Sequence, residues 1–338
     1  MPLAVLEMND QALLIQAEGE PLHAEPGFAR LLPQGIETGE AARATAWREP
    51  KHSYDQYWCH LNQTPLAARE RWARHHADIA FAQLRHLWQS AGSPGSLIIL
   101  VPGSFSDAQL SLLLGLVEAL PSGAAAVIDS ALAGCLKISR ETLFVDLQLH
   151  QAVLTRCRPE GNGISIAGQE VIPDLGMMQI YNSAARHISD LLIRSARHDP
   201  LHASGSEQAI YNHLPDWLTR LRWEEKVSDT LLSDQGELPF TLRRKDVTRL
   251  FNERLINMRS IVARHPGCHL VLSHASGLLT GISEEFSAAE VAGQSAGIDN
   301  VLLHHPLILD QIDGLHDSCL LFVVYAYQIV VYVHHQHS

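Results

Sequence analysis

Five consecutive large apolar residues, LIILV at 97–101, constrain the fold of this chain more than any other feature. A strand with apolar side chains on both faces must be covered on both, which is the situation of a central strand in a helix-flanked sheet. Pro102 and Gly103 follow directly and turn the chain away from the strand. The run therefore predicts a layered arrangement of sheet and helices.

Strand-like and helix-like segments alternate around this run. Strands are predicted at 124–128, 143–146 and 269–273, and helices at 66–91, 107–120, 181–197 and 245–265. Hairpins at 3–17 and 143–157 add antiparallel strands and argue against a purely parallel sheet. With 338 residues, the chain is long enough for two domains. The predicted fold class is α/β, with mixed sheets flanked by helices.

The charge balance and the cysteines limit the classes of partner. Lys and Arg number 25 against 37 Asp and Glu, and the net charge of -12 disfavours nonspecific binding to nucleic acid or anionic membranes. Five dispersed cysteines without a CxxC motif are typical of reduced thiols. The first residues lack the basic and long apolar parts of a signal peptide. We therefore expect a cytoplasmic protein.

The segment 319–333 is apolar except for Gln328. It is shorter than the roughly 20 residues that a membrane-spanning helix needs, and its Val, Ile, Tyr and Phe residues favour strands. We predict one or two buried strands, with a membrane tail anchor as the alternative, and leave the role of the segment open.

Several segments, in order, resemble the heat-shock-70 chaperones and their actin-like relatives. ILVPGSFSDAQ at 99–109 resembles the family's strand, proline loop and Asn-Asp-Ala-Gln helix start. IDSALAG at 128–134 resembles its Glu-Pro-Thr-Ala-Ala-Ala-Leu segment, and 143–154 resembles its second phosphate hairpin. TGEAA at 38–42 resembles a first-lobe segment, and LVLSHASG at 270–277 resembles the strand and glycine turn that hold adenosine.

The resemblance implies a two-lobed actin-like (ribonuclease H-like) duplicated fold. The first lobe is expected at 1–142 and the second at 143–338, with a subdomain at about 200–265. The chain ends near the point where the chaperones' ATPase lobes end, so we expect no separate peptide-binding domain. The oligomeric state is left open.

In this family two hairpin turns hold the triphosphate, and each carries an Asp that organises the magnesium shell. The first turn here begins at Glu7, where the family has Asp-x-Gly-Thr-Thr, and the second at Asp146, where it has Asp-x-Gly-Gly-Gly. Asp129 matches the acidic position near the attacking water. With Ser276 and Gly277 of the adenosine turn, these residues are the candidate cofactor-binding set, and no catalytic residue is assigned.

Both turns lack the glycines that let backbone N–H groups approach phosphates. They contain EMNDQ at 7–11 and DLQLH at 146–150. Each lost charge-assisted hydrogen bond costs about 1.5–3 kcal/mol, which disfavours Mg-ATP as a cofactor. The predicted function is a heat-shock-70/actin-like scaffold, a pseudo-ATPase with weak or no ATP binding that acts through an unidentified protein partner. The alternatives are a chaperone-like, nucleotide-binding ATPase with altered phosphate loops and an unrelated α/β enzyme such as a hydrolase.

The remaining motifs give little support to other chemistry. There are 20 histidines but no HExxH motif, so no native metal site is expected, although His334, His335 and His337 could bind metal adventitiously. Ser276 lacks the Gly-x-Ser-x-Gly elbow of hydrolases.

An aromatic cluster in a loop-like region has two interpretations. Trp47, Tyr54, Tyr57 and Trp58 either pack in the interior or form an exposed partner site. Packing is the interpretation that we favour.

Overall fold

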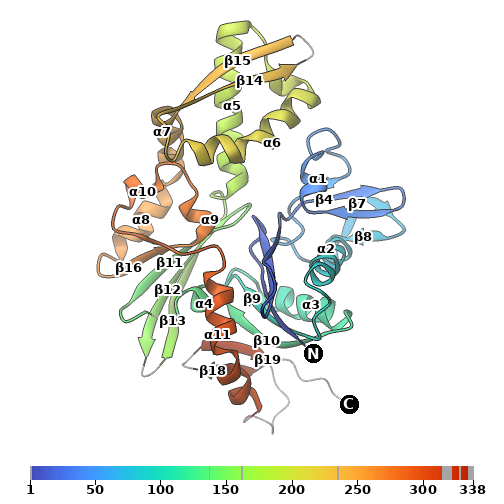
Figure 1. Cartoon of the computed structure of the whole chain (residues 1–338), viewed down its shortest axis with the longest axis vertical. Coiled ribbons are helices and arrows are strands. Elements are labelled where there is room, and N and C mark those ends of the chain that lie inside the picture. The colour runs from blue at the N-terminus through green and yellow to red at the C-terminus, as the bar shows by residue number, and fades with distance from the viewer. Residues whose placement is uncertain are drawn as a thin grey trace.

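The computed structural model describes residues 2–313, apart from 137, 161–162 and 234–235, and the two strands 322–326 and 329–333. It contains two large mixed sheets with helices against them (Figure 1). This architecture confirms the mixed α/β class predicted from the alternation of segments.

Seven strands form the first sheet. In spatial order they are β18 (Phe322–Ala326), β19 (Ile329–Val333), β10 (Gly123–Asp129), β9 (Ser96–Val101), β1 (Leu3–Glu7), β2 (Leu13–Ala17) and β3 (His23–Glu25). β1, β9 and β10 are parallel, whereas β2 and β3 continue from β1 as an antiparallel meander. The apolar run at 97–101 lies in β9, which has a parallel neighbour on each side and is buried.

Five strands form the second sheet. In spatial order they are β13 (Gly163–Ile172), β12 (Ala152–Glu160), β11 (Thr142–Leu147), β16 (His269–Leu272) and β17 (Glu290–Val291). β11, β12 and β13 form an antiparallel meander, and β16 and β17 are parallel to β11. The order and directions therefore match those of β3-β2-β1-β9-β10, and the same five-strand unit occurs twice in the chain.

Helices cover both faces of the first sheet. α2 (His76–Ser90) and α3 (Asp107–Glu118) pack their apolar residues on one face, and α4 (Ser130–Gly134) and α11 (Ala296–Asp313) pack on the other. The remaining elements before α2 are β4 (Ala29–Leu32), β5 (Gly35–Thr38), α1 (Glu40–Arg43), β6 (Ser53–Tyr54), β7 (Pro65–Glu70) and β8 (Ala73–His75).

A group of helices and one hairpin lies between β13 and β16 along the chain. Its elements are α5 (Met177–Ala196), η1 (Pro200–His202), α6 (Ser204–Arg220), β14 (Lys226–Ser233), β15 (Gly236–Arg243), α7 (Arg244–Arg254) and α8 (Ile256–Arg264). α5, α6, β14 and β15 lie at the top of Figure 1, and their apolar residues share one core with β11 and β12. After β16 come two single-turn helices, α9 (His274–Gly277) and α10 (Ile282–Glu285).

Two predicted helices differ from the structure. The helix predicted at 66–91 begins only at His76, because Asp78 accepts the backbone N–H groups of Arg74 and His75 and caps the helix there. The β7–β8 hairpin occupies the preceding residues. The helix predicted at 245–265 is broken at Leu255, a fully buried residue, into α7 and α8.

Contacts between the two halves of the chain include an apolar cluster and an aromatic stack. One apolar cluster joins Val5 and Ile128 of the first sheet to Phe144 of the second and to Ile298 of α11. We call this cluster the shared core. It gives the two sheets a common interior on the side of α4 and α11.

The second contact joins the loop after α1 to α6. Trp47 stacks on Tyr211 with ring centroids 3.8 Å apart, and its backbone N–H donates to Gln208 Oε1 at 2.8 Å. We call this contact the upper bridge.

The aromatic residues near Trp47 are packed, which confirms the favoured interpretation. Tyr57 and Trp58 are buried and both donate to Gln83 Oε1, at 2.5 and 2.8 Å.

The apolar C-terminal segment contributes strands, as predicted. β18 and β19 form a hairpin, and β19 pairs antiparallel with β10. Residues 319–321, 327–328 and the histidines from 334 onward lie outside the described residues. Across the helices that the structure describes, none is both long and apolar enough to cross a bilayer.

Candidate functional site

The two hairpin turns singled out in the sequence lie against each other. One turn joins β1 to β2 and the other joins β11 to β12, at corresponding positions in the two sheets. Glu7 is the last residue of β1, and Asp146 is the last but one of β11. Each residue lies at the carboxyl end of the first strand of its meander. The repeated topology therefore brings the two carboxyl groups close together between the sheets.

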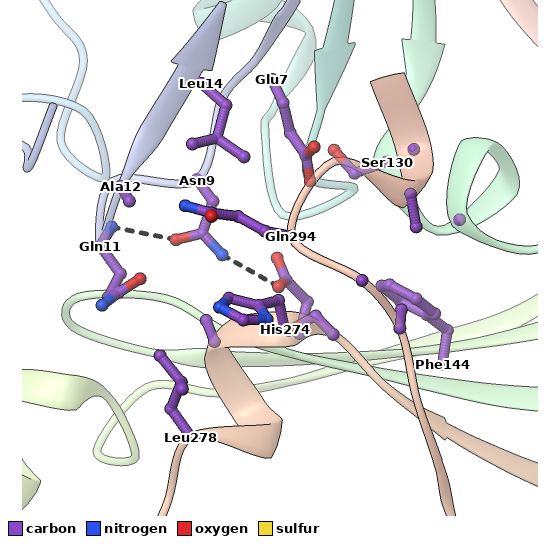
Figure 2. Close-up of a pocket in the computed structure, with 18 residues that line it drawn as sticks. Glu7, Asn9, Gln11, Ala12, Leu14, Ser130, Phe144, His274, Leu278 and Gln294 are labelled. Atoms are coloured by element: carbon purple, nitrogen blue, oxygen red, sulfur yellow. Dashed lines mark hydrogen bonds between the residues drawn. The ribbon is translucent and has the colours of Figure 1, made fainter. Parts of the chain in front are cut away.

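A small cavity separates these strand ends (Figure 2). Its volume is about 130 Å³. The polar residues in its wall include Glu7, Asn9, Gln11, Asp146, His274 and Gln294. Leu14 and Phe144 contribute apolar surface, and the described residues that line the cavity include no Lys or Arg.

The two turns are hydrogen-bonded directly to each other. Asn9 Nδ2 donates to Asp146 Oδ1 at 2.9 Å and to the Leu147 carbonyl at 3.2 Å. The backbone N–H of Leu149 donates to Asp10 Oδ1 at 2.7 Å. Asn9 and Asp10 are both buried, at 8% and 4% exposure. We call these three bonds the turn clasp. Side chains of the first turn are thus hydrogen-bonded to a backbone N–H group and to an acidic side chain of the second turn.

The second turn is also fixed from behind by α5. Met177 and Met178 donate their backbone N–H groups to the carbonyls of Gln148 and Leu149, at 2.9 and 2.8 Å. A Cβ at Gly176 would lie 2.3 Å from the carbonyl carbon of His150, so this close approach requires glycine. The turn is therefore held by backbone contacts on one side and by the clasp on the other.

Burial dominates the electrostatics of the carboxyl groups. Burial, followed by the charge of Asp146, raises the pKa of Glu7 to about 8. Burial raises the pKa of Asp10 to about 6 against the opposing effect of the Leu149 N–H, and it also raises the pKa of Asp146. These groups are crowded together without a lysine or arginine in the cavity wall to offset their charge.

His150 lies beside the clasp and interacts with acids of the first half of the chain. Burial lowers its pKa, but the hydrogen bond and charge of Asp55 and the charge of Asp10 outweigh burial, so the pKa is raised overall. Its Nε2 lies 2.9 Å from the Asp55 carbonyl oxygen. The imidazole therefore pairs with acids of the first half and adds to the contact between the turns.

Asp129 lies close to this site but does not line the cavity. Its Oδ1 accepts the backbone N–H of Ala131 at 2.8 Å and caps α4. Burial raises its pKa to about 6, and the charge of Asp146 contributes to that increase. Asp129 therefore combines a structural role with proximity to the other acids.

Ser276 and Gly277 support the cavity from behind rather than face it. The Ser276 hydroxyl donates to the Val145 carbonyl and accepts the Leu147 N–H, both at 2.9 Å, and the residue is fully buried. A Cβ at Gly277 would lie 2.3 Å from Val291 Cγ1. It is their neighbour His274 that reaches the cavity wall.

The residues that join the two turns, Asn9 and Asp10, were not among the candidate site residues predicted from the sequence. Asn9 and Asp10 form the clasp. The signal that could have identified them is their position in a hairpin turn that begins at an acid, as the second hairpin turn also does. Nothing in the local sequence marks Gln294, which reaches the cavity from the loop before α11.

Comparisons with protein-family models and with curated proteins find no match to this chain. Within the described part of the chain, no group of three or more His, Cys, Asp or Glu side chains is arranged to hold a metal ion.

Proposed function

We propose that this chain is an actin-like, heat-shock-70-related scaffold in which the nucleotide site has been replaced by contacts within the protein. The repeated five-strand unit supports a duplicated, two-lobed fold, with one copy of the unit in each of the expected lobes, 1–142 and 143–338, although α11, β18 and β19 of the second range join the first sheet. The candidate phosphate turns occur at equivalent positions in the two units, as that fold requires. The resemblance of 99–109, 128–134 and 143–154 to the family supports the same assignment.

The turn clasp is the observation that carries the pseudo-ATPase proposal. Backbone N–H groups of a turn are natural ligands for a phosphate oxygen. Here the Leu149 N–H is already bonded to the Asp10 carboxylate at 2.7 Å, so an anion of the protein itself occupies that donor. A triphosphate would have to break this buried bond and displace the amide of Asn9 from Asp146.

Volume and charge support the same conclusion. Sites for drug-sized ligands usually measure about 300–1,000 Å³, whereas this cavity measures about 130 Å³. Its wall carries carboxyl groups and, among the described residues, no lysine or arginine to balance a polyphosphate. The upper bridge between Trp47 and Tyr211 further restricts separation of the two halves.

The proposal also includes a protein partner, which the chain would bind in the cytoplasm. Trp223 is 78% exposed, and the Arg222 guanidinium lies 5.2 Å from its ring centroid. Tryptophan and arginine are the residues most enriched among the dominant contacts of protein interfaces. An exposed tryptophan beside an arginine supports action through protein–protein interaction.

Isothermal titration with Mg-ATP tests the pseudo-ATPase proposal. We expect no binding heat at micromolar protein, for the chain and for Asp146→Ala alike. As a matched control, Asp190→Ala changes an exposed acid on α5. Micromolar affinity that Asp146→Ala abolishes and Asp190→Ala preserves would overturn the proposal.

The second candidate is a nucleotide-binding ATPase with altered phosphate loops. It is favoured by the convergence of Glu7, Asp129 and Asp146, since the charge of Asp146 acts on both of the others. This candidate predicts that millimolar ATP or ADP raises the melting temperature and that Asp146→Ala removes the increase. A serine hydrolase has less support, because the Ser276 hydroxyl is buried and bonded to backbone.

A further inference from the structure

One surface of the molecule is basic, although the chain as a whole is acidic. Over the full sequence, Lys and Arg number 25 against 37 Asp and Glu. Exposed basic side chains nevertheless gather on α5, β15 and α7, three elements that pack against one another (Figure 1). They are Arg194, Arg197, Arg243, Lys245 and Arg249. We call these five residues the basic surface.

The electrostatics of His187 on α5 show that two of these side chains lie close together. Burial lowers the pKa of His187, and the charges of Arg194 and Arg249 contribute in the same direction. Two acids, Asp190 and Asp246, oppose them. Guanidinium groups from two different helices are therefore near one imidazole, where two acids face the five residues of the basic surface.

The basic surface has no acidic partner within the described part of the chain. Nearby arginines do have one: Arg244 lies 3.8 Å from Glu284, and Arg259 lies 3.3 Å from Glu285. The five residues of the basic surface, by contrast, form no ion pair and no side-chain hydrogen bond with another described residue. Uncompensated positive charge of this kind attracts a negatively charged partner and favours its association.

A groove with apolar side chains borders the basic surface. Its volume is about 580 Å³, and Leu191, Phe240 and Arg243 are among the residues that line it. Asp229, an acid of the same wall, is already hydrogen-bonded within the protein. Ile193 lies two residues from Leu191 on α5 and is 43% exposed. The surface therefore offers positive charge and apolar contact side by side.

This combination favours an acidic protein segment over a nucleic acid. A long polyanion would extend beyond the basic surface and meet the remainder of a chain whose net charge is -12. Single-stranded nucleic acids also bind by stacking bases on aromatic rings, whereas Phe240 is only 7% exposed. A short segment with both carboxylates and aliphatic side chains matches the charge and the groove together.

We propose that the basic surface binds an acidic segment of a partner protein, whose carboxylates pair with Arg194 and Arg249 and whose apolar side chains enter the groove beside Leu191. The proposal rests on the proposed function in one respect, that the chain acts through a protein partner. It adds the chemistry of that partner and the surface that receives it.

Fluorescence anisotropy with model peptides tests the proposal. The probe is a fluorescein-labelled peptide of about ten residues in which Glu and Leu alternate, long enough to span roughly 30 Å when extended. The comparison peptide has Gln in place of every Glu. We expect the Glu peptide to bind with a dissociation constant below about 1 mM, at least about tenfold more tightly than the Gln peptide. The difference should disappear at about 1 M salt, where charges are screened within about 3 Å.

A pair of matched charge reversals locates the binding. The double variant Arg194→Glu/Arg249→Glu should weaken binding of the Glu peptide by at least about tenfold, since ion pairs are lost and repulsion replaces them. Arg48→Glu/Arg85→Glu changes the net charge equally at two exposed positions of the first half and should bind as the parent does. All four positions are exposed, so the melting temperatures should stay close to that of the parent.

Three results would contradict the proposal. They are equal affinities for the Glu and Gln peptides, equal losses in the two double variants, and tighter binding of a labelled oligothymidylate than of the Glu peptide. The last result would identify the basic surface as a nucleic-acid site instead.

Mg-ATP in the same assay separates this proposal from the proposed function. If Mg-ATP binds at micromolar concentration and Asp146→Ala abolishes that binding, while the Glu peptide still requires Arg194 and Arg249, the scaffold proposal fails and the acidic-segment site stands. If neither Mg-ATP nor the Glu peptide binds, the acidic-segment site fails and the pseudo-ATPase proposal stands.

Discussion

The buried carboxyl group of Glu7 should destabilise the folded protein at alkaline pH, and the neutral isostere Glu7→Gln should remove that cost. Burial raises the pKa in the folded state from 4.5 to about 8. The stabilising contribution of the protonated group is complete below pH 4.5 and is lost as the pH rises through 8. One pKa unit is equivalent to about 1.4 kcal/mol, so the penalty in the free energy of unfolding reaches about 4 kcal/mol at pH about 8.

Calorimetry of the chain and of Glu7→Gln at two pH values measures this penalty. For a chain of this length, about 4 kcal/mol corresponds to a rise in melting temperature of about 5 °C for the variant at pH about 8. At pH about 5 the difference should fall below about 1 kcal/mol, because the folded-state group is then protonated.

Glu18→Gln is the control for this comparison, since it changes an exposed acid and should alter neither value by more than about 0.5 kcal/mol. A glutamine variant that is no more stable than the parent at alkaline pH, or a difference that does not change with pH, would refute the electrostatic argument.

Three further substitutions test the contacts around the site. Asp10→Ala removes the acceptor of the Leu149 N–H and should lower the free energy of unfolding by about 2–4 kcal/mol in urea titrations, whereas Asp10→Asn should cost about 1 kcal/mol. Gly176→Ala places a Cβ within 2.3 Å of the second turn's backbone, and we expect circular dichroism melts to show a loss of about 3 kcal/mol or more. Gly205→Ala, which has open space on α6, should be neutral or stabilising by up to about 1 kcal/mol. Gln83→Leu leaves a buried hydroxyl and an indole N–H unpaired, and chemical denaturation should show a loss of about 2–3 kcal/mol.

Local sequence patterns were sufficient for the fold class and for the central strands of the two large sheets, but they missed β3 to β8, β13, β14 and β17. β9, β10 and β11 were predicted because continuous apolar runs of five or so residues have few other uses, and the hairpins followed from polar turn residues between such runs. The helix predicted at 66–91 was wrong in its first part, because helical spacing of apolar residues there did not reveal the cap that Asp78 forms.

The candidate site could be predicted only in outline. Glu7 and Asp146 were identified as strand-end acids, and the structure brings both to one cavity. The bonds from Asn9 and Asp10 to the second turn span more than 130 positions in the chain, and no local pattern encodes such a pairing. Ser276 and Gly277 were chosen by resemblance, yet they pack behind the wall.

The shared core has a consequence for dissecting the protein into fragments. Val5 and Ile128 bury their side chains together with Phe144 from the second sheet and Ile298 from α11. A fragment ending at residue 142 would present this surface to water, and exposed apolar patches of that kind promote aggregation. Truncation experiments that aim to separate the activities of the two halves should therefore yield insoluble material unless both pieces are produced together.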